Sequence, residues 1–368
     1  MFAFTAQGGW LPEGNLTTKW SIMTGPRIAV LGAGANGASI GADLTLAGED
    51  VTLIEQWPAH VEAMRSRGIR VELADGVIET PVRTMHLCEV ATLRQPFDIV
   101  LMLMKAYDSR WAAQLIEPYL APDGLLVGVQ NGMSLDVISE VVGAARTLGC
   151  VIEISSTMTD PGVVHRHSGP DRSWFALGSA SAESAGREEE VARLLRHSGT
   201  VAIVDDIRAT KWMKLVSNAT VLVTTANLGL SMSEAIEVPG MRELMVASGN
   251  EALDAGHAQG FPVLPIFGLE PAEVEDRTAV VDTLLDALYR GFVTANTTTT
   301  VLQDWSKSRH SEVDDLNGQV VARSRAAGFD APVNAAVVEV AHRIERGELV
   351  PQPSNLGLMR ELAGLPVR

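Results

Sequence analysis

Cysteine is scarce in this sequence of 368 residues, which contains only Cys88 and Cys150. Two thiols cannot build a disulfide framework or a four-cysteine zinc site, and their scarcity is typical of a protein from the reducing cytoplasm. The histidines are scattered: His165 and His167 could share one face of a strand, but no carboxylate or thiolate accompanies them at ligand spacing. We therefore expect a cytoplasmic protein without a metal site.

Long apolar runs and positive charge are also in short supply. No stretch is apolar for long enough to cross a bilayer, which excludes a transmembrane span. The 29 lysines and arginines face 45 aspartates and glutamates, so the net charge is −16. Such an acidic chain repels phosphate backbones and anionic lipid, and we expect neither nucleic acid nor a membrane surface as a partner. With 46% hydrophobic residues, the chain is long enough for two domains with sizeable cores.

The N-terminal residues 1–25 lack the basic start and apolar run of a secretory signal. A second methionine, Met23, comes just before the first strong structural pattern, at Arg27. We therefore expect an N-terminal extension that takes no part in the fold. It is either a loose segment of the natural protein or the result of a start site placed too early.

Short β-rich runs alternate with helical segments from Arg27 onward. This alternation favours a parallel sheet covered by helices on both faces, and thus a Rossmann-type α/β domain. Residues 70–83 are typical of a hairpin insertion, and residues 150–178 are expected to extend the same sheet. Strands are expected at 27–32, 50–55, 98–104, 124–129 and 201–204, and helices at 35–47 and 60–67.

Strand signals disappear after Asp206, where we place the domain boundary. Apolar residues then recur at helical spacing, which predicts an all-helical C-terminal domain. The expected division is an extension at 1–25, a dinucleotide-binding domain at 26–205, a helical substrate domain at 206–350 and a tail at 351–368. Helices are expected at 212–228, 241–258, 272–289, 313–326 and 333–344.

The run Gly32-Ala33-Gly34-Ala35-Asn36-Gly37 follows an expected strand and opens an expected helix. In this context the glycines permit a tight turn and close approach of a ligand to the backbone. The helix N-terminus then offers free N–H groups to a pyrophosphate. The run therefore predicts a dinucleotide site, and the alternative is a glycine-rich turn without a ligand.

Glu55 ends the second expected strand, 18 positions beyond the last glycine of the run. A carboxylate there can accept both hydroxyls of an adenosine ribose and would repel a 2′-phosphate. The nearest cations along the chain, Arg65 and Arg67, come a helix later. We therefore expect NAD to be preferred, with NADP as the alternative cofactor. Glu55 could also be no more than a solvated strand end.

Two further polar groups follow later strands at the carboxyl edge, where open α/β sheets bind ligands. Lys105 comes after the run that ends at Met104, and a cofactor phosphate or ribose would satisfy it. It could equally be a surface lysine at a strand end. Asn131 could donate to a carboxamide or carbonyl, or could only form the turn that Asn-Gly favours.

Lys214 and Asn218 stand four positions apart on an expected helix, so their side chains share one face. Trp212 and Leu215 give this face an apolar surround that would desolvate the ammonium. Together with a positive nicotinamide nearby, desolvation would make Lys214 a usable general acid. The alternative is a solvated lysine beside a structural asparagine.

Ser311, Glu312 and Asp314 precede another helical pattern. Ser311 is predicted to be the N-cap and Asp314 the acid of a capping box, which explains both residues structurally. Glu312 has no such explanation, and nothing in its neighbourhood of the chain decides whether it belongs to a site.

Together these segments resemble the ketopantoate reductase (2-dehydropantoate 2-reductase) family, from Arg27 to Gly347. The resemblance implies a Rossmann domain followed by a helical domain, with the active site in the cleft between them. It also implies hydride transfer from a nicotinamide to the C2 carbonyl of a small 2-oxo acid. The segments that carry it are the glycine run, Met104-Lys105-Ala106, Gln130-Asn131-Gly132, Trp212 to Asn218 and Thr300 to Gly318.

The resemblance also implies roles for single residues, with Lys214 protonating the developing alkoxide of the product. The implied catalytic group is Lys214, Asn131 and Glu312. The implied substrate contacts are Asn218 and Thr300. The implied cofactor contacts are Gly32, Ala33, Gly34, Ala35, Asn36, Gly37, Glu55, Lys105, Asn131, Ser156 and Glu312.

Three positions depart from the family pattern. Leu222 stands where a second asparagine is usual, Thr300 replaces a serine, and Glu55 replaces the arginine that ends this strand in NADP-using members. Because a missing donor changes which polar groups of a substrate can be satisfied, an NAD-linked catabolic dehydrogenase of a different hydroxy acid is an alternative. A non-catalytic dinucleotide sensor is a second alternative, against which the retained lysine argues. The helical domain could also support a homodimer.

Overall fold

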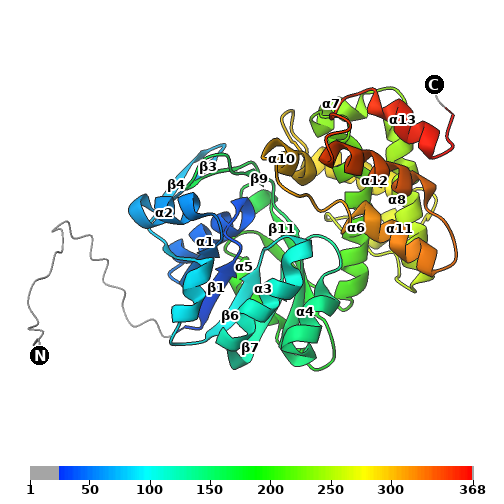
Figure 1. The fold of residues 1–368 in the computed structure, drawn as a ribbon. Helices are drawn as coiled ribbons and strands as arrows, with labels where there is room; N and C mark the ends of the chain where they lie inside the picture. The colour runs from blue at the N-terminus through cyan, green and yellow to red at the C-terminus, as the bar shows by residue number, and fades with distance from the viewer. Residues whose placement is uncertain (1–24, 367–368) are drawn as a thin grey trace, which may run out of the picture.

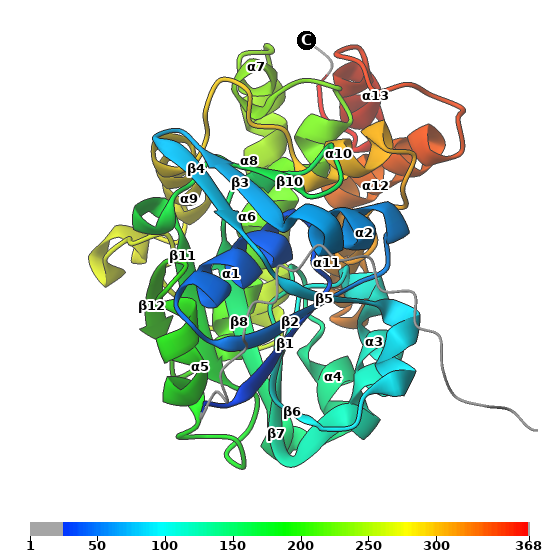
Figure 2. The same cartoon turned by 90° about the vertical axis from the view of Figure 1, so that its left-hand side faces the viewer.

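The structure is a computed structural model that describes residues 25–366. The predicted N-terminal extension at residues 1–25 lies, apart from Gly25, outside the described residues. Figure 1 and Figure 2 show an α/β domain, blue to green, followed along the chain by a helical region, green to red. This order confirms the fold class expected from the sequence. We keep the division between the two parts at Asp206 as a proposal.

The α/β domain is built on an eight-stranded sheet with the order β12-β11-β8-β7-β6-β1-β2-β5. Neighbouring strands are parallel except for the antiparallel pair β8 and β11. The chain leaves β1 toward β2 and returns to β6 on the other side of β1, which makes the carboxyl ends of β1 and β6 a switch point where such sheets bind ligands. The strands are β1 (Arg27–Leu31), β2 (Asp50–Glu55), β5 (Arg83–His86), β6 (Phe97–Met102), β7 (Leu120–Gly128), β8 (Thr147–Glu153), β11 (Trp174–Ser179) and β12 (Thr200–Ile203).

Helices cover both faces of this sheet, because successive apolar residues of a strand point to opposite sides. Ile28 and Val30 of β1 pack with α1 and α5 on one face. Ala29 and Leu31 pack with α3 and α4 on the other. The helices of this domain are α1 (Ala35–Leu46), α2 (Pro58–Arg67), α3 (Ser109–Ile116), α4 (Leu135–Val142) and α5 (Glu188–Leu195).

A second, four-stranded sheet has the order β4-β3-β10-β9 and includes the expected hairpin, formed by β3 and β4. The expectation that residues 150–178 extend the main sheet is only partly right. The ends of this segment lie in β8 and β11, but its middle turns away after Glu153 and pairs with β3. The strands of the second sheet are β3 (Ile69–Leu73), β4 (Gly76–Thr80), β9 (Ser156–Thr157) and β10 (Val163–Arg166).

A buried ion pair fastens β10 to α1. The guanidinium of Arg166 has no exposed side-chain surface and donates to Asp43 Oδ2 at 2.6 Å. Three more of its N–H groups donate to Ser173 Oγ and to the carbonyl oxygens of Ser168 and Ser198. Burial raises the pKa of Asp43, and the charge of Arg166 opposes this effect. Each nitrogen of the buried guanidinium thus has a hydrogen-bond partner, which compensates for the burial of its charge.

The helical region is organised around α6, which begins at Ile207 after Asp206 caps the N–H of Ala209 at 2.9 Å. The helix expected at 272–289 begins only at Val280, because a 3₁₀ turn starting at Pro271 and a loop precede it. The tail contains a helix at residues 355–362. The helices are α6 (Ile207–Ala226), α7 (Met232–Ile236), α8 (Met241–Ala258), α9 (Val280–Gly291), α10 (Thr300–Ser306), α11 (Asn317–Ala326), α12 (Pro332–Glu345) and α13 (Asn355–Leu362).

The prediction that Ser311 caps a helix is wrong. Residues 313–316 form a turn, and α11 begins at Asn317. The Ser311 hydroxyl instead donates to Glu345 Oε1 at 2.6 Å, and Asp314 lies 3.1 Å from His342 Nε2. Their nearest partners are on α12, so a contact distant in sequence replaced the expected local capping box.

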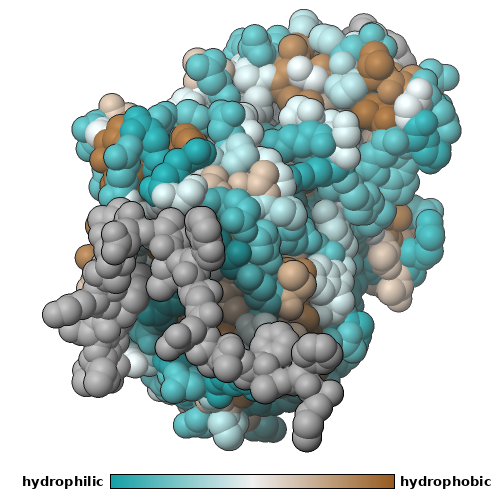
Figure 3. All heavy atoms as spheres, turned by 60° about the vertical axis from the view of Figure 1, so that its left-hand side comes forward, coloured by the Kyte–Doolittle hydropathy of each residue, from teal (hydrophilic) through white to brown (hydrophobic). Residues whose placement is uncertain are grey.

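The molecular face drawn in Figure 3 is largely hydrophilic, with apolar atoms in scattered patches. Within residues 25–366, no helix combines the length and the apolar character needed to cross a membrane.

Candidate active site

The glycine run forms the turn between β1 and α1 at the carboxyl edge of the sheet. Gly32 has a φ of +94°, and a Cβ there would lie 2.8 Å from the backbone of Leu103. A Cβ on Gly37 would lie 2.1 Å from the carbonyl oxygen of Gly32. These two glycines are therefore required by close packing within the protein.

Gly34 is different, because a Cβ at this position would meet nothing within 4 Å. It is the N-cap of α1, and no side chain caps the helix. The N–H groups of the first helical turn thus face the cleft without a side-chain partner, next to a glycine whose missing side chain leaves room for a ligand. This cradle fits an anionic group such as a pyrophosphate.

Two predicted cofactor residues do not line the cleft. Ala33 is fully buried, and its carbonyl oxygen lies 3.0 Å from His60 Nε2. Glu55 is also buried, and its Oε1 accepts the N–H groups of Gln56 and Trp57, each at 2.9 Å. Burial raises the pKa of the Glu55 carboxyl, although the two N–H groups oppose this effect. Glu55 therefore shapes the loop after β2 through these two hydrogen bonds.

Sequence reasoning missed Arg309, the cation whose charge opposes the raised pKa of Glu55. Its guanidinium lies 5.6 Å from the ring centroid of Trp57 and lines the cleft from the helical region. By contrast, Arg65 pairs with Glu62 and Glu89. No signal in the sequence pairs Arg309 with Trp57, because the two residues meet only through the fold.

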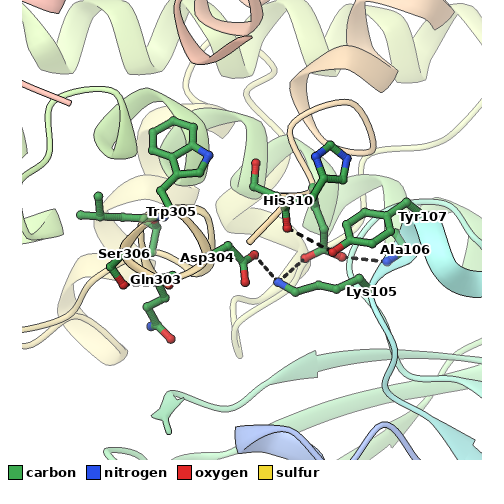
Figure 4. A network of polar contacts seen from close by, with 12 residues as sticks. Lys105, Ala106, Tyr107, Gln303, Asp304, Trp305, Ser306 and His310 are labelled. Carbon is green, nitrogen blue, oxygen red and sulfur yellow. Dashed lines mark hydrogen bonds and ion pairs between the residues drawn. The ribbon is translucent and has the colours of Figure 1, made fainter. Parts of the chain in front are cut away.

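Lys105 lies at the centre of a polar network across the cleft (Figure 4). Its Nζ donates to Asp304 Oδ2 at 2.5 Å and lies 3.4 Å from Glu312 Oε2. The other oxygen of Glu312 accepts the N–H of Ala106 at 2.9 Å. Burial opposes the charge of Lys105, but the two carboxylates outweigh it and raise the pKa of the lysine. Burial also raises the pKa of Asp304, which the sequence analysis left without a role.

Ser156 and Asn36, both predicted cofactor residues, contact each other. The Ser156 hydroxyl on β9 donates to Asn36 Oδ1 at 2.5 Å. This contact places the second sheet against the start of α1, and both side chains line the cleft.

The turn after β7 carries Asn131. The Gln130 side chain fixes this turn by donating to the Met104 carbonyl at 3.1 Å and to Ser109 Oγ at 2.9 Å. The buried Lys211 donates to the Gln130 carbonyl at 2.7 Å, and burial lowers the pKa of Lys211 to about 8. Asn131 Oδ1 then accepts the side-chain N–H of Asn218 at 3.1 Å. This bond joins the sheet edge directly to α6.

Lys214 and Asn218 lie on one face of α6, as the sequence predicts, and both are almost fully buried. The Lys214 ammonium pairs with the Glu153 carboxylate at the end of β8. It also lies 4.9 Å from the centre of the Phe267 ring. The sequence analysis missed both partners, since neither stands near Lys214 in the chain.

A smaller pocket adjoins the cleft and contains Lys214 and Asn218. Asn36, Ser156 and Thr300 line both spaces, so the two are continuous. Thr300 Oγ1 is buried and has no hydrogen-bond partner in the structure. A hydroxyl left in this state is a ready contact for a polar ligand. The apolar wall of the pocket consists of Ile154, Val221, Leu222, Met232, Leu288, Phe292 and Val293.

No group of three histidine, cysteine, aspartate or glutamate side chains is placed to hold a metal ion among residues 25–366. The expected absence of a metal stays a prediction. The anion cradle, the Lys105 network and the pocket with Lys214 form one connected site between the sheet and the helical region.

Comparisons with known proteins agree on one family. Residues 28–180 match the model described as "Ketopantoate reductase PanE/ApbA", and residues 206–345 match its C-terminal counterpart. A 2-dehydropantoate 2-reductase from Archaeoglobus fulgidus is 27% identical over 325 residues, covering 87% of this chain and 98% of the relative.

Solved structures share the fold. A PanE/ApbA family ketopantoate reductase from Ralstonia eutropha has a TM-score of 0.73 at 23% identity, covering 88% of this chain and 99% of that one. D-mandelate dehydrogenase, in a ternary structure with NADH and anilino(oxo)acetate, has a TM-score of 0.76 at 19% identity, covering 87% and 99%.

Proposed function

Because the chain belongs to the ketopantoate reductase family, whose members are oxidoreductases acting on CH–OH groups, we propose that it interconverts a small 2-oxo acid and its 2-hydroxy acid with a nicotinamide cofactor. The observation that carries the proposal is the connection between two spaces. The cleft at the glycine turn opens into a pocket that holds Lys214 and Asn218, a buried cation and an amide on one helix face.

The chain's own residues fit a dinucleotide. The uncapped N-terminus of α1 and the open side of Gly34 suit a pyrophosphate, and Lys105 and Glu312 lie further along the same cleft. We assign cofactor binding to these residues together with Asn36, Ser156 and Asn131. When bound, the nicotinamide supplies or accepts the hydride.

Lys214 is the proposed acid. Its ammonium would donate a proton to the C2 oxygen as negative charge develops there, which stabilises the transition state more than the bound substrate. Asn218 and Thr300 would orient the substrate, and the orphan hydroxyl of Thr300 supports this role. The hydrogen bond from Asn218 to Asn131 would hold the substrate contact and the cofactor contact in a fixed relative position. In the oxidative direction, the neutral amine of Lys214 would take the same proton.

We propose NAD as the preferred cofactor. Glu55 places a carboxylate at the end of β2, where it would repel a 2′-phosphate. D-mandelate dehydrogenase, a structural relative, was solved with NADH, which supports the same preference. NADP stays the alternative, and the position of Arg309 beside this loop is the observation that favours it.

A second candidate is an NAD-linked dehydrogenase that oxidises a different hydroxy acid. The apolar side chain of Leu222 lines the pocket at the position where the family resemblance implies an asparagine, so this pocket offers one polar contact fewer than that pattern. A substrate with an apolar substituent would satisfy that wall better than a hydroxylated one. We further propose a homodimer, which sedimentation velocity would test.

Steady-state oxidation of NADH and NADPH, with ketopantoate as acceptor, tests the proposal. Rapid turnover supports ketopantoate as substrate, and the NADH-to-NADPH ratio tests the cofactor preference. NADH binding without turnover favours the second candidate, which is then tested with hydroxy acids and NAD. Absence of both binding and turnover would contradict the proposed function.

A further inference from the structure

Glu153 and Phe267 contact the Lys214 ammonium from different parts of the fold. Glu153 ends β8 in the α/β domain, and its carboxylate pairs with Nζ of Lys214. Phe267 lies in the loop between α8 and α9, and its ring centroid is 4.9 Å from the same nitrogen. Nothing in the reaction described above gives either residue a task.

The backbone of Phe267 is unusual. Its φ is +60°, and Ser308 is the only other non-glycine residue with a positive φ among residues 25–366. A bulky side chain rarely adopts this conformation, which persists where the surrounding structure enforces it and is found most often at functional sites. The Phe267 ring also packs against Phe292, which lines the substrate pocket, with ring centroids 5.6 Å apart.

The contacts of Lys214 leave one direction open. An ammonium has three N–H donors, and the Glu153 carboxylate accepts one of them. The face of the Phe267 ring attracts the positive charge on a second side. The side that remains is the pocket, which Lys214 and Asn218 line together.

We propose that Glu153 and Phe267 are positioning residues for Lys214. The carboxylate holds the ammonium in place within the pocket, and the ring fixes its direction, so that one N–H points to the C2 oxygen of the substrate. In reduction, this N–H bond breaks as the O–H bond of the hydroxy acid forms, and a solvent proton then restores the ammonium. The catalytic part of this inference rests on the proposed function.

Other charged groups are separated from this pair. Glu153 and Lys214 are the only ionisable side chains among the described residues that line the substrate pocket. Lys211, on the same helix, is buried and donates to the carbonyl oxygens of Gln130 and Cys150. The ionisable side chains of the adjoining cofactor cleft are Lys105, Asp304, Lys307, Arg309 and Glu312.

The first test compares kinetics of variants with matched geometry. Glu153→Gln keeps the shape and removes the charge, and Phe267→Leu keeps apolar bulk and removes the ring. We expect kcat to fall about tenfold to a hundredfold in each, with KM and the cofactor Kd within about twofold, because misdirected groups cost rate more than affinity. Glu153→Asp should recover part of the loss.

Glu49→Gln is the control, since Glu49 has a similar side-chain exposure (15%, against 14% for Glu153), pairs with Arg193 and lies outside the site. Glu49→Gln should change neither kcat nor KM. Unchanged kcat in both site variants would overturn the proposal and leave the proposed function standing.

A second measurement needs no turnover. The chain has five lysines, so reductive methylation with ¹³C allows NMR to follow each one, with Lys214→Arg to assign the signal of Lys214. At a fixed neutral pH, the chemical shift of Lys214 should change in Glu153→Gln and in Phe267→Leu, because each variant removes a group that contacts the ammonium, and should stay constant in Glu49→Gln. An unchanged shift in both site variants overturns the positioning role. A changed shift in a protein that reduces no oxo acid supports that role and counts only against the proposed function.

Discussion

The Nζ atom of Lys105 lies 2.5 Å from Oδ2 of Asp304, and the two residues stand 199 positions apart in the chain. This ion pair joins the carboxyl edge of the sheet to α10, and Glu312 adds a second carboxylate to the same lysine. This contact between the helical region and the sheet therefore also sets the charge inside the cleft. With the cofactor contacts proposed above, stability and cofactor binding would be coupled through these three side chains.

The first prediction concerns this network. Lys105→Met leaves the carboxylates of Asp304 and Glu312 without their cation, and should lower the free energy of unfolding by about 3 kcal/mol at pH 8. The deficit should shrink on acidification. A carboxyl group whose pKa is raised by folding binds more protons in the folded state, so lower pH stabilises that state, and burial already raises the pKa of Asp304. Urea denaturation between pH 5 and pH 8 measures both effects.

The double variant Lys105→Met with Asp304→Asn is the control, because it also removes the Asp304 charge that the single variant leaves without a counter-ion. It should regain part of the lost stability. A deficit that neither pH nor the second substitution reduces would argue that the pair does not hold the fold together.

A second prediction addresses the proposed acid. Lys214→Ala should reduce kcat/KM for the oxo acid by about 10² to 10⁴, the usual contribution of a positioned proton donor. The Kd of NADH, measured by fluorescence titration, should stay within about twofold. Arg193→Ala, which removes a cation on α5 outside the cleft, should change neither quantity. Retained turnover in Lys214→Ala would refute the assignment of the acid.

A third prediction tests the basis of cofactor choice. Glu55→Gln keeps an oxygen for the N–H groups of Gln56 and Trp57 but removes the negative charge. The kcat/KM ratio of NADPH to NADH should rise about tenfold, because juxtaposed like charges cost binding energy. Glu62→Gln, an exposed carboxylate on the next helix, is the control. An equal ratio in both variants would mean that Glu55 only shapes the loop.

A fourth prediction concerns the apolar wall of the substrate pocket. Leu222→Asn restores an amide at this position and should favour ketopantoate over 4-methyl-2-oxopentanoate by about tenfold to a hundredfold in kcat/KM. Leu222→Met keeps the wall apolar and should leave the ratio near that of the unmodified chain. If the amide and the thioether behave alike, position 222 does not select the substrate.

A fifth prediction follows from His60, whose pKa burial lowers to about 4. Between pH 6.5 and pH 4 the unfolded chain binds a proton at this residue that the folded chain does not, so stability rises with pH across this window. This group alone should make the protein about 2 kcal/mol less stable at pH 5 than at pH 7. Urea denaturation of the unmodified chain and of His60→Gln compares the slopes, and equal slopes would exclude His60 as the source.

Local signals account for the parts that the sequence predicted well. The strand expected at 50–55 and the helix expected at 241–258 have the bounds that the structure gives to β2 and α8. Alternation and helical periodicity are properties of short windows, so they can be read without the fold. The glycine turn and the helix face shared by Lys214 and Asn218 are also set by short stretches of sequence, so they too could be predicted.

The site residues that could not be predicted depend on contacts between segments that are far apart in the sequence. Glu153 is 61 positions from Lys214, and Asp304 is 199 positions from Lys105. Phe267 carries no sequence signal at all, because its positive φ favours glycine or asparagine rather than an aromatic residue. The expected helix cap at Ser311 failed for a related reason. The local sequence favours a capping box, but the Ser311 hydroxyl donates instead to a residue of α12 that is distant in the chain.

The buried pair of Arg166 and Asp43 limits how the dinucleotide domain can be divided. The first βαβ unit contains Asp43, but its counter-ion arrives 123 residues later, on β10. A fragment that ends before residue 166 would bury a carboxylate without a cation or would leave α1 unable to dock. The glycine turn and α1 therefore cannot be moved alone into another protein. An engineered fusion would also have to include the second sheet, which supplies Arg166.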